Sequence, residues 1–283
     1  MNLEKKSVYT FKMGNSSNTK MRQRRLAMRD ILDEMTVAPF HEKVALIVEP
    51  RAHVNLVPVI TQMANLHPDW FIYLYHGNLN QSYVTTHPEL TQLRNDGKLA
   101  LFHLHVDNIN SLTYNALFTT LAFWNTVNAH YAFVFQTDAW ICDQADFDLD
   151  DFLRYDYVGS PRSLFGVKFL NGGVSLRNVE AMKDMIETCT YNPDSFRGVL
   201  GEDVFFSQPC RDISKRYTAA PQKSAANFSL QQNAFYKSDR TPIAVHKPWV
   251  KFSAVSNKNM LNLEKTCPGV MQMAANYKLS ANK

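Results

Sequence analysis

The first half of the chain carries four short apolar runs of strand length at regular intervals. They begin near residues 44, 70, 99 and 131, so successive starts lie 26, 29 and 32 residues apart. Segments with a helical pattern fill the intervals, at residues 57–66, 89–96 and 111–127. Because a strand and its crossover helix take about 30 residues, this rhythm predicts an α/β fold with a mostly parallel, doubly wound (Rossmann-like) sheet. Right-handed crossovers then place helices on both faces of the sheet.

The segment 111–127 has large apolar side chains spaced for one buried helix face. They are Tyr114, Leu117, Phe118, Leu121 and Trp124. We expect this aromatic stripe to belong to the core and not to a cofactor site.

The composition is that of a globular protein with a sizeable core, since 45% of the 283 residues are hydrophobic and 20% are charged. The chain has no internal repeat and no Gly/Ser linker. We therefore expect a single domain at residues 41–252, a basic and partly helical N-terminal extension at 1–40, and a C-terminal extension at 253–283. Residues 21–35 suit a helix within the first extension.

Positive charge is concentrated at the N-terminus. Residues 1–30 contain eight basic and two acidic residues, a net charge of +6, whereas the whole chain carries +4. Such a segment can contact an anionic surface peripherally, or it can be a solvated tail or helix face. Aromatic residues are not interleaved with these charges, which disfavours nucleic acid as a partner.

The four cysteines are widely spaced and form no CxxC pair, so neither a zinc site nor a redox pair is indicated. We expect reduced thiols in a cytosolic setting, although a disulfide stays compatible with the sequence. No apolar run approaches the ~20 residues that span a bilayer, and the N-terminus lacks the apolar h-region of a secretory signal. These features predict a cytoplasmic location.

Residues 131–140 (YAFVFQTDAW) have the pattern of a buried strand with a polar end. In open α/β sheets ligands bind at the carboxyl ends of the strands, so Asp138 is placed for chemistry. Asp138 can hold a divalent metal on a diphosphate. It can equally cap a helix or form a turn.

Two polar segments in the second half of the chain are further candidates. The run Asn171-Gly172-Gly173 allows close backbone approach and positive φ, so it can form the wall of a sugar or acceptor pocket, or a tight hairpin turn. The pair Glu202-Asp203 directly precedes an apolar run. One of these carboxylates can take the proton of an acceptor hydroxyl, or both can be charges that favour a helix N-terminus.

Five charged or titratable residues complete the candidates. His246 can ligate a metal and Lys247 can face phosphate oxygens, but a half-buried histidine beside a surface lysine is the simpler interpretation. Glu49, Arg51 and Arg162 lie near predicted strand ends. Glu49 can accept a hydrogen bond from a base or ribose, and either arginine can hold a phosphate.

Several motifs of other enzyme classes are missing from the sequence. Neither G-x-G-x-x-G nor G-x-x-x-x-G-K-[ST] occurs, which argues against dinucleotide oxidoreductases and P-loop phosphotransferases. The G-x-S-x-G elbow of α/β-hydrolases is also missing.

The order of these segments resembles that of GT-A-type glycosyltransferases. Those enzymes combine a nucleotide-binding α/β half, a D-x-D strand end, a Gly-Gly segment, an acidic pair and a late metal-binding histidine. The closest resemblance is to the glycosyltransferase-like family known as domain of unknown function 5672. It spans about residues 42–252 and rests on VEPR, DWFIYLYHG, YNALF, FW, FQTD, FLRYDYVGSP, NGGVSLRN, EDVFF and HKPW.

The resemblance implies a GT-A-like fold and roles for particular residues. The implied metal ligands are Asp138 and His246, and the implied catalytic residues are Asp203, as base, with Glu202 beside it. The residues expected to bind the donor nucleotide are Glu49, Arg51, Gln136, Thr137 and Lys247. The residues expected to bind the sugar or acceptor are Asn171, Gly172, Gly173, Arg162 and Trp249.

One position departs from the family pattern, because Gln136 stands where D-x-D has its first aspartate. An amide can bond a ribose hydroxyl but brings no charge to a Mn²⁺ or Mg²⁺ ion. We expect an inverting glycosyltransferase that moves a sugar from a nucleoside-diphosphate sugar to a hydroxyl of a glycan or glycoconjugate. The alternatives are a non-catalytic module that binds nucleotide sugars or carbohydrate, which Gln136 favours, and a nucleotidyltransferase, which the lack of a Gly-rich loop after the first strand disfavours.

Overall fold

The computed structural model describes most of the chain from residue 37 onward. The described residues are 37–164, 166–192, 201–231, 240–249 and 257–281, together with Leu32 and Met35. The basic segment 1–30 lies outside them, as does the predicted helix 21–35 apart from these two residues.

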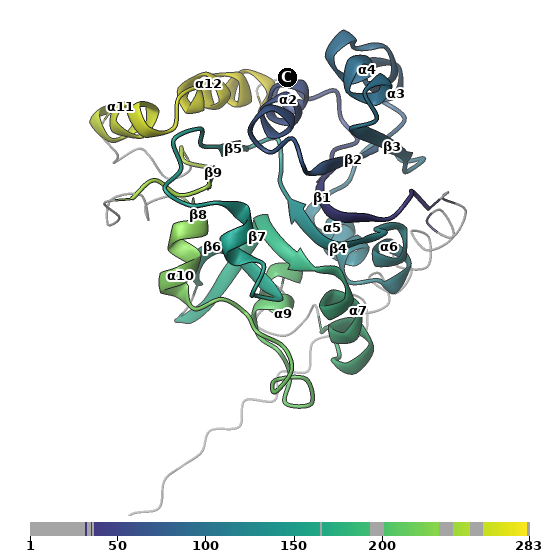
Figure 1. Cartoon of the computed structure of the whole chain (residues 1–283), viewed down its shortest axis with the longest axis vertical. Coiled ribbons are helices and arrows are strands. Elements are labelled where there is room, and N and C mark those ends of the chain that lie inside the picture. Colours follow the sequence, from purple (N-terminus) through teal and green to yellow (C-terminus); the bar gives the residue numbers. More distant parts are fainter. Residues whose placement is uncertain are drawn as a thin grey trace, which may run out of the picture.

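A six-stranded sheet forms the centre of the molecule, with the order β3-β2-β1-β4-β7-β6 (Figure 1). Its strands are β1 (His41–Val48), β2 (Phe71–His76), β3 (Leu99–His103), β4 (Ala129–Val134), β6 (Tyr157–Leu164) and β7 (Val167–Asn178). The first four pair in parallel, whereas β7 runs antiparallel to both β4 and β6. The predicted mixed α/β class and mostly parallel sheet are therefore confirmed, and the four parallel strands are those that the sequence rhythm indicated.

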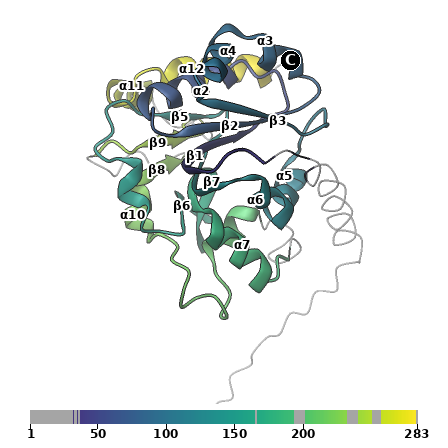
Figure 2. The same ribbon diagram turned by 45° about the vertical axis from the view of Figure 1, so that its right-hand side comes forward.

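Helices cover both faces of this sheet (Figures 1 and 2). They are α2 (Leu56–Leu66), α3 (Gln81–Thr86), α4 (Pro88–Asn95), α5 (Ser111–Phe118), α6 (Leu121–Thr126), α7 (Val179–Thr188), α9 (Glu202–Ser207) and α10 (Gln222–Phe228), with a 3₁₀ turn η1 (Leu149–Phe152). The prediction of one helix over 111–127 is wrong. Thr119 and Thr120 bond their hydroxyls back to the carbonyls of Asn115 and Leu117 and separate α5 from α6.

A second, three-stranded sheet is built from segments far apart in the sequence. It has the order β5-β9-β8, with β5 (Ala139–Ile141), β9 (Ala244–His246) and β8 (Ser229–Gln231). Antiparallel pairing sets Ala139 opposite His246. The helices α11 (Asn257–Thr266) and α12 (Val270–Ala281) lie beside β5 and α2 (Figure 1). This sheet therefore brings the end of β9 to the turn that follows β4.

A bulge interrupts the pairing of β6 with β7. Asn171 pairs with Ser160, and Ser175 pairs with Gly159, although Gly159 and Ser160 are adjacent in β6. Residues 172–174 thus have no partner in β6 and form a loop out of the ladder, as extra residues in one strand of an antiparallel pair do. The double glycine is therefore part of a bulged strand, and the hairpin-turn alternative is wrong.

All four cysteines are paired, so the expectation of reduced thiols is wrong. Cys142 is bonded to Cys267, and Cys189 to Cys210. Disulfides persist in oxidising compartments and are rare in the cytosol, so this pairing argues against the predicted cytoplasmic location. Within the described ranges, no helix has the length and apolarity needed to cross a bilayer.

Candidate functional site

A cleft of about 260 Å³ opens at the carboxyl ends of β1 and β4. The chain passes from β1 to β2 and β3 on one side and then returns to β4 on the other side of β1. Such a switch point is where ligands bind in doubly wound sheets. The lining residues are Val48, Glu49, Pro50, Arg51, Ile109, Asn110, Ser111, Tyr114, Asn115, Gln136, Thr137, Asp138, Lys247 and Tyr277.

Asp138 and Lys247 line one corner of this cleft, and the buried His246 bonds Asp138 from behind, although 108 residues separate Asp138 from His246 along the chain. His246 Nε2 lies 3.1 Å from Asp138 Oδ1, and Lys247 Nζ lies 3.2 Å from Asp138 Oδ2. The backbone N–H of Lys247 donates to the carbonyl of Asp138 at 2.9 Å. We name these three residues the corner cluster.

The charges of the corner cluster follow from its burial. Burial by itself would raise the pKa of Asp138, but the neighbouring His246 and Lys247 outweigh it and hold that pKa well below its usual range. Burial lowers the pKa of the His246 imidazole, although the neighbouring Asp138 acts in the opposite direction. Its Nε2 bonds Asp138, and its buried Nδ1 has no hydrogen-bond partner among the described residues. In the corner cluster the carboxylate of Asp138 is therefore engaged by both the imidazole of His246 and the ammonium of Lys247.

Glu49 and Arg51 form a second pair in the cleft. Arg51 donates from Nε at 2.8 Å and from Nη2 at 2.7 Å to the two carboxylate oxygens of Glu49. Thr137 also donates to Glu49, at 3.2 Å. These three of the five predicted nucleotide-binding residues therefore lie together in the cleft, between β1 and β4.

The glycines of the β7 bulge lie against two different groups of side chains. A methyl group on Gly173 would collide with the imidazole of His246 and come within 2.9 Å of Gln136 Oε1. A methyl group on Gly172 would collide with Glu202 and come within 2.6 Å of Arg177 Nη2. Only residues without a side chain fit here, so the bulge is a thin wall between the corner cluster and the region of Glu202.

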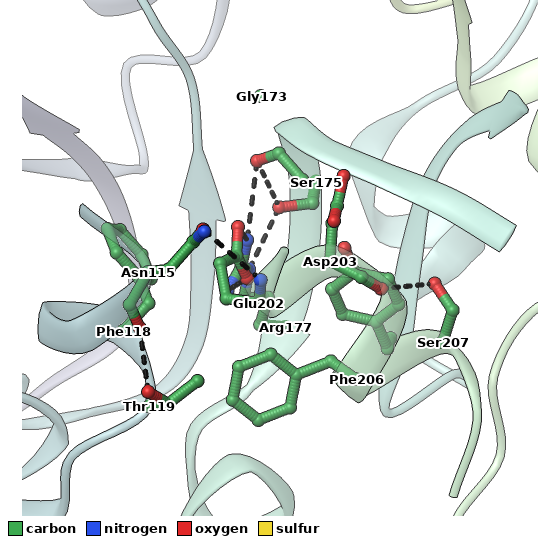
Figure 3. A network of polar contacts seen from close by, with 12 residues as sticks. Asn115, Phe118, Thr119, Gly173, Ser175, Arg177, Glu202, Asp203, Phe206 and Ser207 are labelled. Atoms are coloured by element: carbon green, nitrogen blue, oxygen red, sulfur yellow. Dashed lines mark hydrogen bonds and ion pairs between the residues drawn. The ribbon is translucent and has the colours of Figure 1, made fainter. Parts of the chain in front are cut away.

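Arg177 and Glu202 form a buried ion pair behind this wall (Figure 3). Arg177 Nη1 and Nη2 donate to Glu202 at 2.8 and 3.1 Å, and Nη2 also reaches the carbonyl of Gly172 at 3.3 Å. The guanidinium lies 4.9–5.8 Å from the centres of four aromatic rings. These rings belong to Phe118, Trp124, Tyr157 and Phe206. Both oxygens of Glu202 are engaged by Arg177, which leaves Asp203 as the better candidate base.

Asp203 lies beside this ion pair, in the first turn of the helix α9. Its Oδ2 accepts from Asn171 Nδ2 at 2.9 Å, and its Oδ1 accepts from the backbone of Val204 at 2.8 Å. Burial and the adjacent Glu202 raise the pKa of Asp203 to about 6, although Val204, Arg177 and Arg162 act in the opposite direction. A carboxylate with this pKa can accept a proton near neutral pH.

Asn171 connects Asp203 to the corner cluster. Its Nδ2 bonds Asp203, and its Oδ1 accepts from the N–H of Gly173 at 3.1 Å. Gly173 in turn lies against His246. The predicted base and the predicted diphosphate corner are therefore linked by contacts through one short segment of β7.

Arg162 and Trp249 lie at the margin of the site. Arg162 on β6 lies over the ring of Phe169 at 5.9 Å. Its positive charge partly offsets the rise in the pKa of Asp203 and adds to the lowering of the pKa of His246. Trp249 packs on the ring of Tyr277 at 5.0 Å, behind the cleft wall. Arg162 thus lies near the expected site, whereas Trp249 supports a lining residue.

The corner cluster fits a divalent metal poorly. Asp138 and His246 are the expected ligands, and Gln136 adds an amide oxygen near His246. Both oxygens of Asp138 are already bonded to cluster partners, and one of these is a cation. In the part of the chain that the structure describes, no three His, Cys, Asp or Glu side chains are grouped to hold a metal ion. The Mn²⁺ or Mg²⁺ ion stays a prediction, and no step of the chemistry below depends on it.

Several residues of the site were missed by sequence reasoning or placed elsewhere, and four of them are Tyr114, Asn115, Arg177 and Tyr277. Tyr114, expected in the core, lines the cleft together with Asn115, while Leu117, Phe118 and Trp124 are buried as predicted. Tyr277 comes from α12, within the predicted C-terminal extension. Arg177 lies in the strand β7, and nothing in the sequence indicates that it pairs with Glu202. For Tyr114 and Asn115, the sequence offered one signal. A polar asparagine directly after an aromatic residue, near the start of the helix, could have indicated that this part of the helix faces a cleft.

A family model described as "Protein of unknown function (DUF5672)" matches residues 100–246, just over half of the chain. No curated protein matches the chain. Among solved structures, the apo structure of the bifunctional glycosyltransferase WbbM is similar, with 11% sequence identity and a TM-score of 0.43. This similarity covers 86% of the present chain and 53% of the WbbM chain, so the present chain spans about half the length of that protein.

Proposed function

The chain belongs to the family described as "Protein of unknown function (DUF5672)", and from this premise we propose that it is a glycosyltransferase of the GT-A type. It transfers a sugar from a nucleoside-diphosphate sugar to a hydroxyl of a glycan or glycoconjugate, with inversion at the sugar carbon. The observation that carries the proposal is the meeting of Asp138 and Lys247, with His246 bonded to Asp138 behind them, in a cleft at the switch point of the sheet.

The cleft offers the groups that a donor needs. Glu49 keeps lone pairs that can accept from a ribose or base, and Arg51 is half-exposed beside it. Lys247 supplies positive charge at the corner where the diphosphate binds. Gln136 and Thr137 lie between these two positions and can bond the ribose or the first phosphate.

Asp203 acts as the base. The acceptor oxygen forms a bond to the anomeric carbon while the bond from that carbon to the diphosphate oxygen breaks, and the electron pair leaves with the diphosphate. The acceptor proton passes to Asp203. Since its pKa is about 6, this carboxyl is ionised at neutral pH and close enough to the working pH to accept a proton efficiently.

The surrounding residues hold the base. Asn171 fixes one oxygen of Asp203, and the Gly172–Gly173 bulge lets His246 on one side and Glu202 with Arg177 on the other approach the backbone closely. The Arg177–Glu202 pair anchors the same bulge from behind, through the carbonyl of Gly172. We assign Glu202 a positioning role in place of the catalytic one.

The test is a thermal-shift screen of UDP- and GDP-sugars, followed by measurement of nucleoside diphosphate released from the sugar that binds. The wild-type protein should release the nucleotide. Asp203→Asn should bind the donor equally well but lose turnover by about 10²–10⁴-fold, while the exposed Asp212→Asn should behave as wild type. Loss of donor binding and turnover together in Asp203→Asn would contradict its role as base.

The second candidate function is a non-catalytic module that binds nucleotide sugars, which the neutral Gln136 favours. This candidate predicts donor binding with no nucleotide release from the wild-type protein. The same screen therefore separates the two.

A further inference from the structure

Lys247 lies beside the carboxylate that the sequence assigns to a metal. Its Nζ lies 3.2 Å from Asp138 Oδ2, at the edge of the cleft, and its side chain is 33% exposed. The carboxylate that the sequence assigns to a metal is thus already paired with a cation of the protein itself.

The other oxygen of Asp138 is engaged as well. His246 Nε2 bonds Oδ1 at 3.1 Å, and the His246 side chain is only 2% exposed. A divalent ion bound to this carboxylate would have to displace one of the two partners and lie next to an ammonium group. Gln136, at the position of the missing aspartate, adds no charge to offset that repulsion.

The backbone also fixes Lys247 at this position. Its φ is +47°, a left-handed conformation that only His105 shares among the described non-glycine residues. Residues other than glycine, asparagine and aspartate rarely adopt this conformation, because their Cβ atom crowds the backbone. The N–H of Lys247 meanwhile donates to the carbonyl of Asp138 at 2.9 Å. Backbone and side chain together therefore hold the ammonium over the aspartate.

Lys247 is the cleft cation that lies beside Asp138 and keeps donors for a ligand. The charged residues that line the cleft are Glu49, Arg51, Asp138 and Lys247. Arg51 also keeps donors, but its guanidinium is held on Glu49 through Nε and Nη2. An ammonium has three donors and no fixed plane, so Lys247 can keep its contact with Asp138 and still bond phosphate oxygens.

We propose that Lys247 is a resident cation that takes the place of the divalent metal, so that the protein binds nucleoside diphosphates without a metal ion. This inference rests on the proposed function. As the bond between the anomeric carbon and the diphosphate oxygen breaks, the ammonium of Lys247 pairs with the charge that develops on the leaving oxygen, and it transfers no proton. Asp138 is then the positioning residue for Lys247, and His246 holds Asp138 in place.

The experiment is calorimetric titration of the full chain with UDP, GDP, dTDP, ADP and CDP, once in EDTA and once in Mn²⁺. At least one nucleotide should bind in EDTA, with a dissociation constant within about threefold of that in Mn²⁺. Lys247→Met keeps most of the stem and removes the charge, so it should weaken binding in EDTA by about 10–100-fold, as expected when a hydrogen bond to a charged group is lost. Lys247→Asn serves as a second variant, because asparagine tolerates the left-handed backbone.

The matched control is Lys98→Met, which removes an exposed ammonium at the amino end of the edge strand β3, whereas the cleft lies at the carboxyl ends of β1 and β4. It should bind as wild type does. Binding that requires Mn²⁺, or equal affinity in Lys247→Met and Lys98→Met, would overturn the inference and leave the proposed function standing. If none of the five nucleotides binds under either condition, the proposed function fails and this inference fails with it.

Discussion

Two carboxylate–cation pairs lie on opposite sides of one bulged strand, and they differ in what surrounds them. Asp138 and Lys247 face the cleft, and the lysine is one-third exposed. Glu202 and Arg177 are sealed, with the arginine side chain 0% exposed among aromatic rings. The lysine of the first pair can therefore bind a ligand, whereas the second pair can only stabilise the fold.

The comparison shows that an ion pair by itself does not mark a binding site. A pair contributes to binding when one member can reach solvent with donors to spare, and to architecture when both members are fully bonded inside the protein. The two environments lie next to each other, since Gly172 contacts the sealed pair and the adjacent Gly173 contacts His246 of the corner cluster.

The largest expected effect is on stability, and it separates the two cations. Arg177→Met leaves the Glu202 charge buried without its partner, so the free energy of unfolding should fall by about 3–5 kcal/mol. Lys247→Met removes the cation of the open pair and should cost about 1 kcal/mol. Urea denaturation of both variants measures this difference.

A control follows from the same physics. The double variant Arg177→Met, Glu202→Leu replaces the sealed pair by apolar side chains and should recover much of the lost stability. Equal losses in Arg177→Met and Lys247→Met would remove the distinction between the two pairs.

The two disulfides allow a second comparison, because one is close in sequence to the cleft residue of α12 and the other to the helix that carries Asp203. Cys142–Cys267 holds the chain just before α12, which carries the cleft residue Tyr277, and it joins residues 125 apart in sequence. Cys189–Cys210 joins the end of α7 to the segment that follows α9, the helix that carries Asp203 in its first turn, with a separation of 21. Replacing each pair by alanines should lower the free energy of unfolding by about 2–4 kcal/mol, more for the longer loop.

The functional consequences should differ between these disulfide variants. Loss of Cys142–Cys267 should weaken donor binding, and loss of Cys189–Cys210 should reduce turnover with binding retained. Calorimetry and nucleotide release on the two double-alanine variants test this, and the reverse assignment would contradict it.

The two bulge glycines offer a finer test, since each touches one pair. Gly172→Ala crowds Glu202 and Arg177, and Gly173→Ala crowds His246 and Gln136. Added volume at a packed site costs about 1–3 kcal/mol. We expect this cost to appear as lost stability in Gly172→Ala and as lost donor affinity in Gly173→Ala. The same pattern in both variants would show that the bulge does not separate two regions.

The smallest effect is the pH response of the two aspartates. Asp203 has a pKa of about 6 and must be ionised to act as base, so turnover should fall about tenfold per pH unit below 6 and level off above it. The pKa of Asp138 is held well below its usual range, so Asp138 stays charged throughout. Binding of the donor sugar nucleotide should therefore be flat between about pH 5 and 8. A turnover that rises as the pH falls below 6 would contradict the assignment of Asp203.

The sequence predicted local elements well and long-range contacts poorly. The four parallel strands follow from apolar runs at βα spacing, and the polar end of β4 pointed to Asp138 because strand ends carry sites. The pairing of Arg177 with Glu202 depends on the bulge, and a register shift leaves no mark in a single sequence. The break after α5 also escaped, since Thr119-Thr120 is a weak helix breaker whose hydroxyls act only in context.

The cysteines show the same limit. The thiols were expected to be reduced because the cysteines are widely spaced and form no CxxC pair, but this spacing carries no information on which sulfurs meet in the fold. In the fold, Cys142 at the end of β5 meets Cys267 between α11 and α12 because β5 lies beside those helices (Figure 1).

The most direct test of the account is an experimental structure of the protein with the nucleoside diphosphate that binds it. The account predicts the diphosphate in the cleft between β1 and β4, with phosphate oxygens at hydrogen-bonding distance, about 3 Å, from Lys247 Nζ. It also predicts Asp203 across the bulge from that diphosphate. A nucleotide bound elsewhere, or one whose diphosphate points away from Asp138, His246 and Lys247, would contradict it.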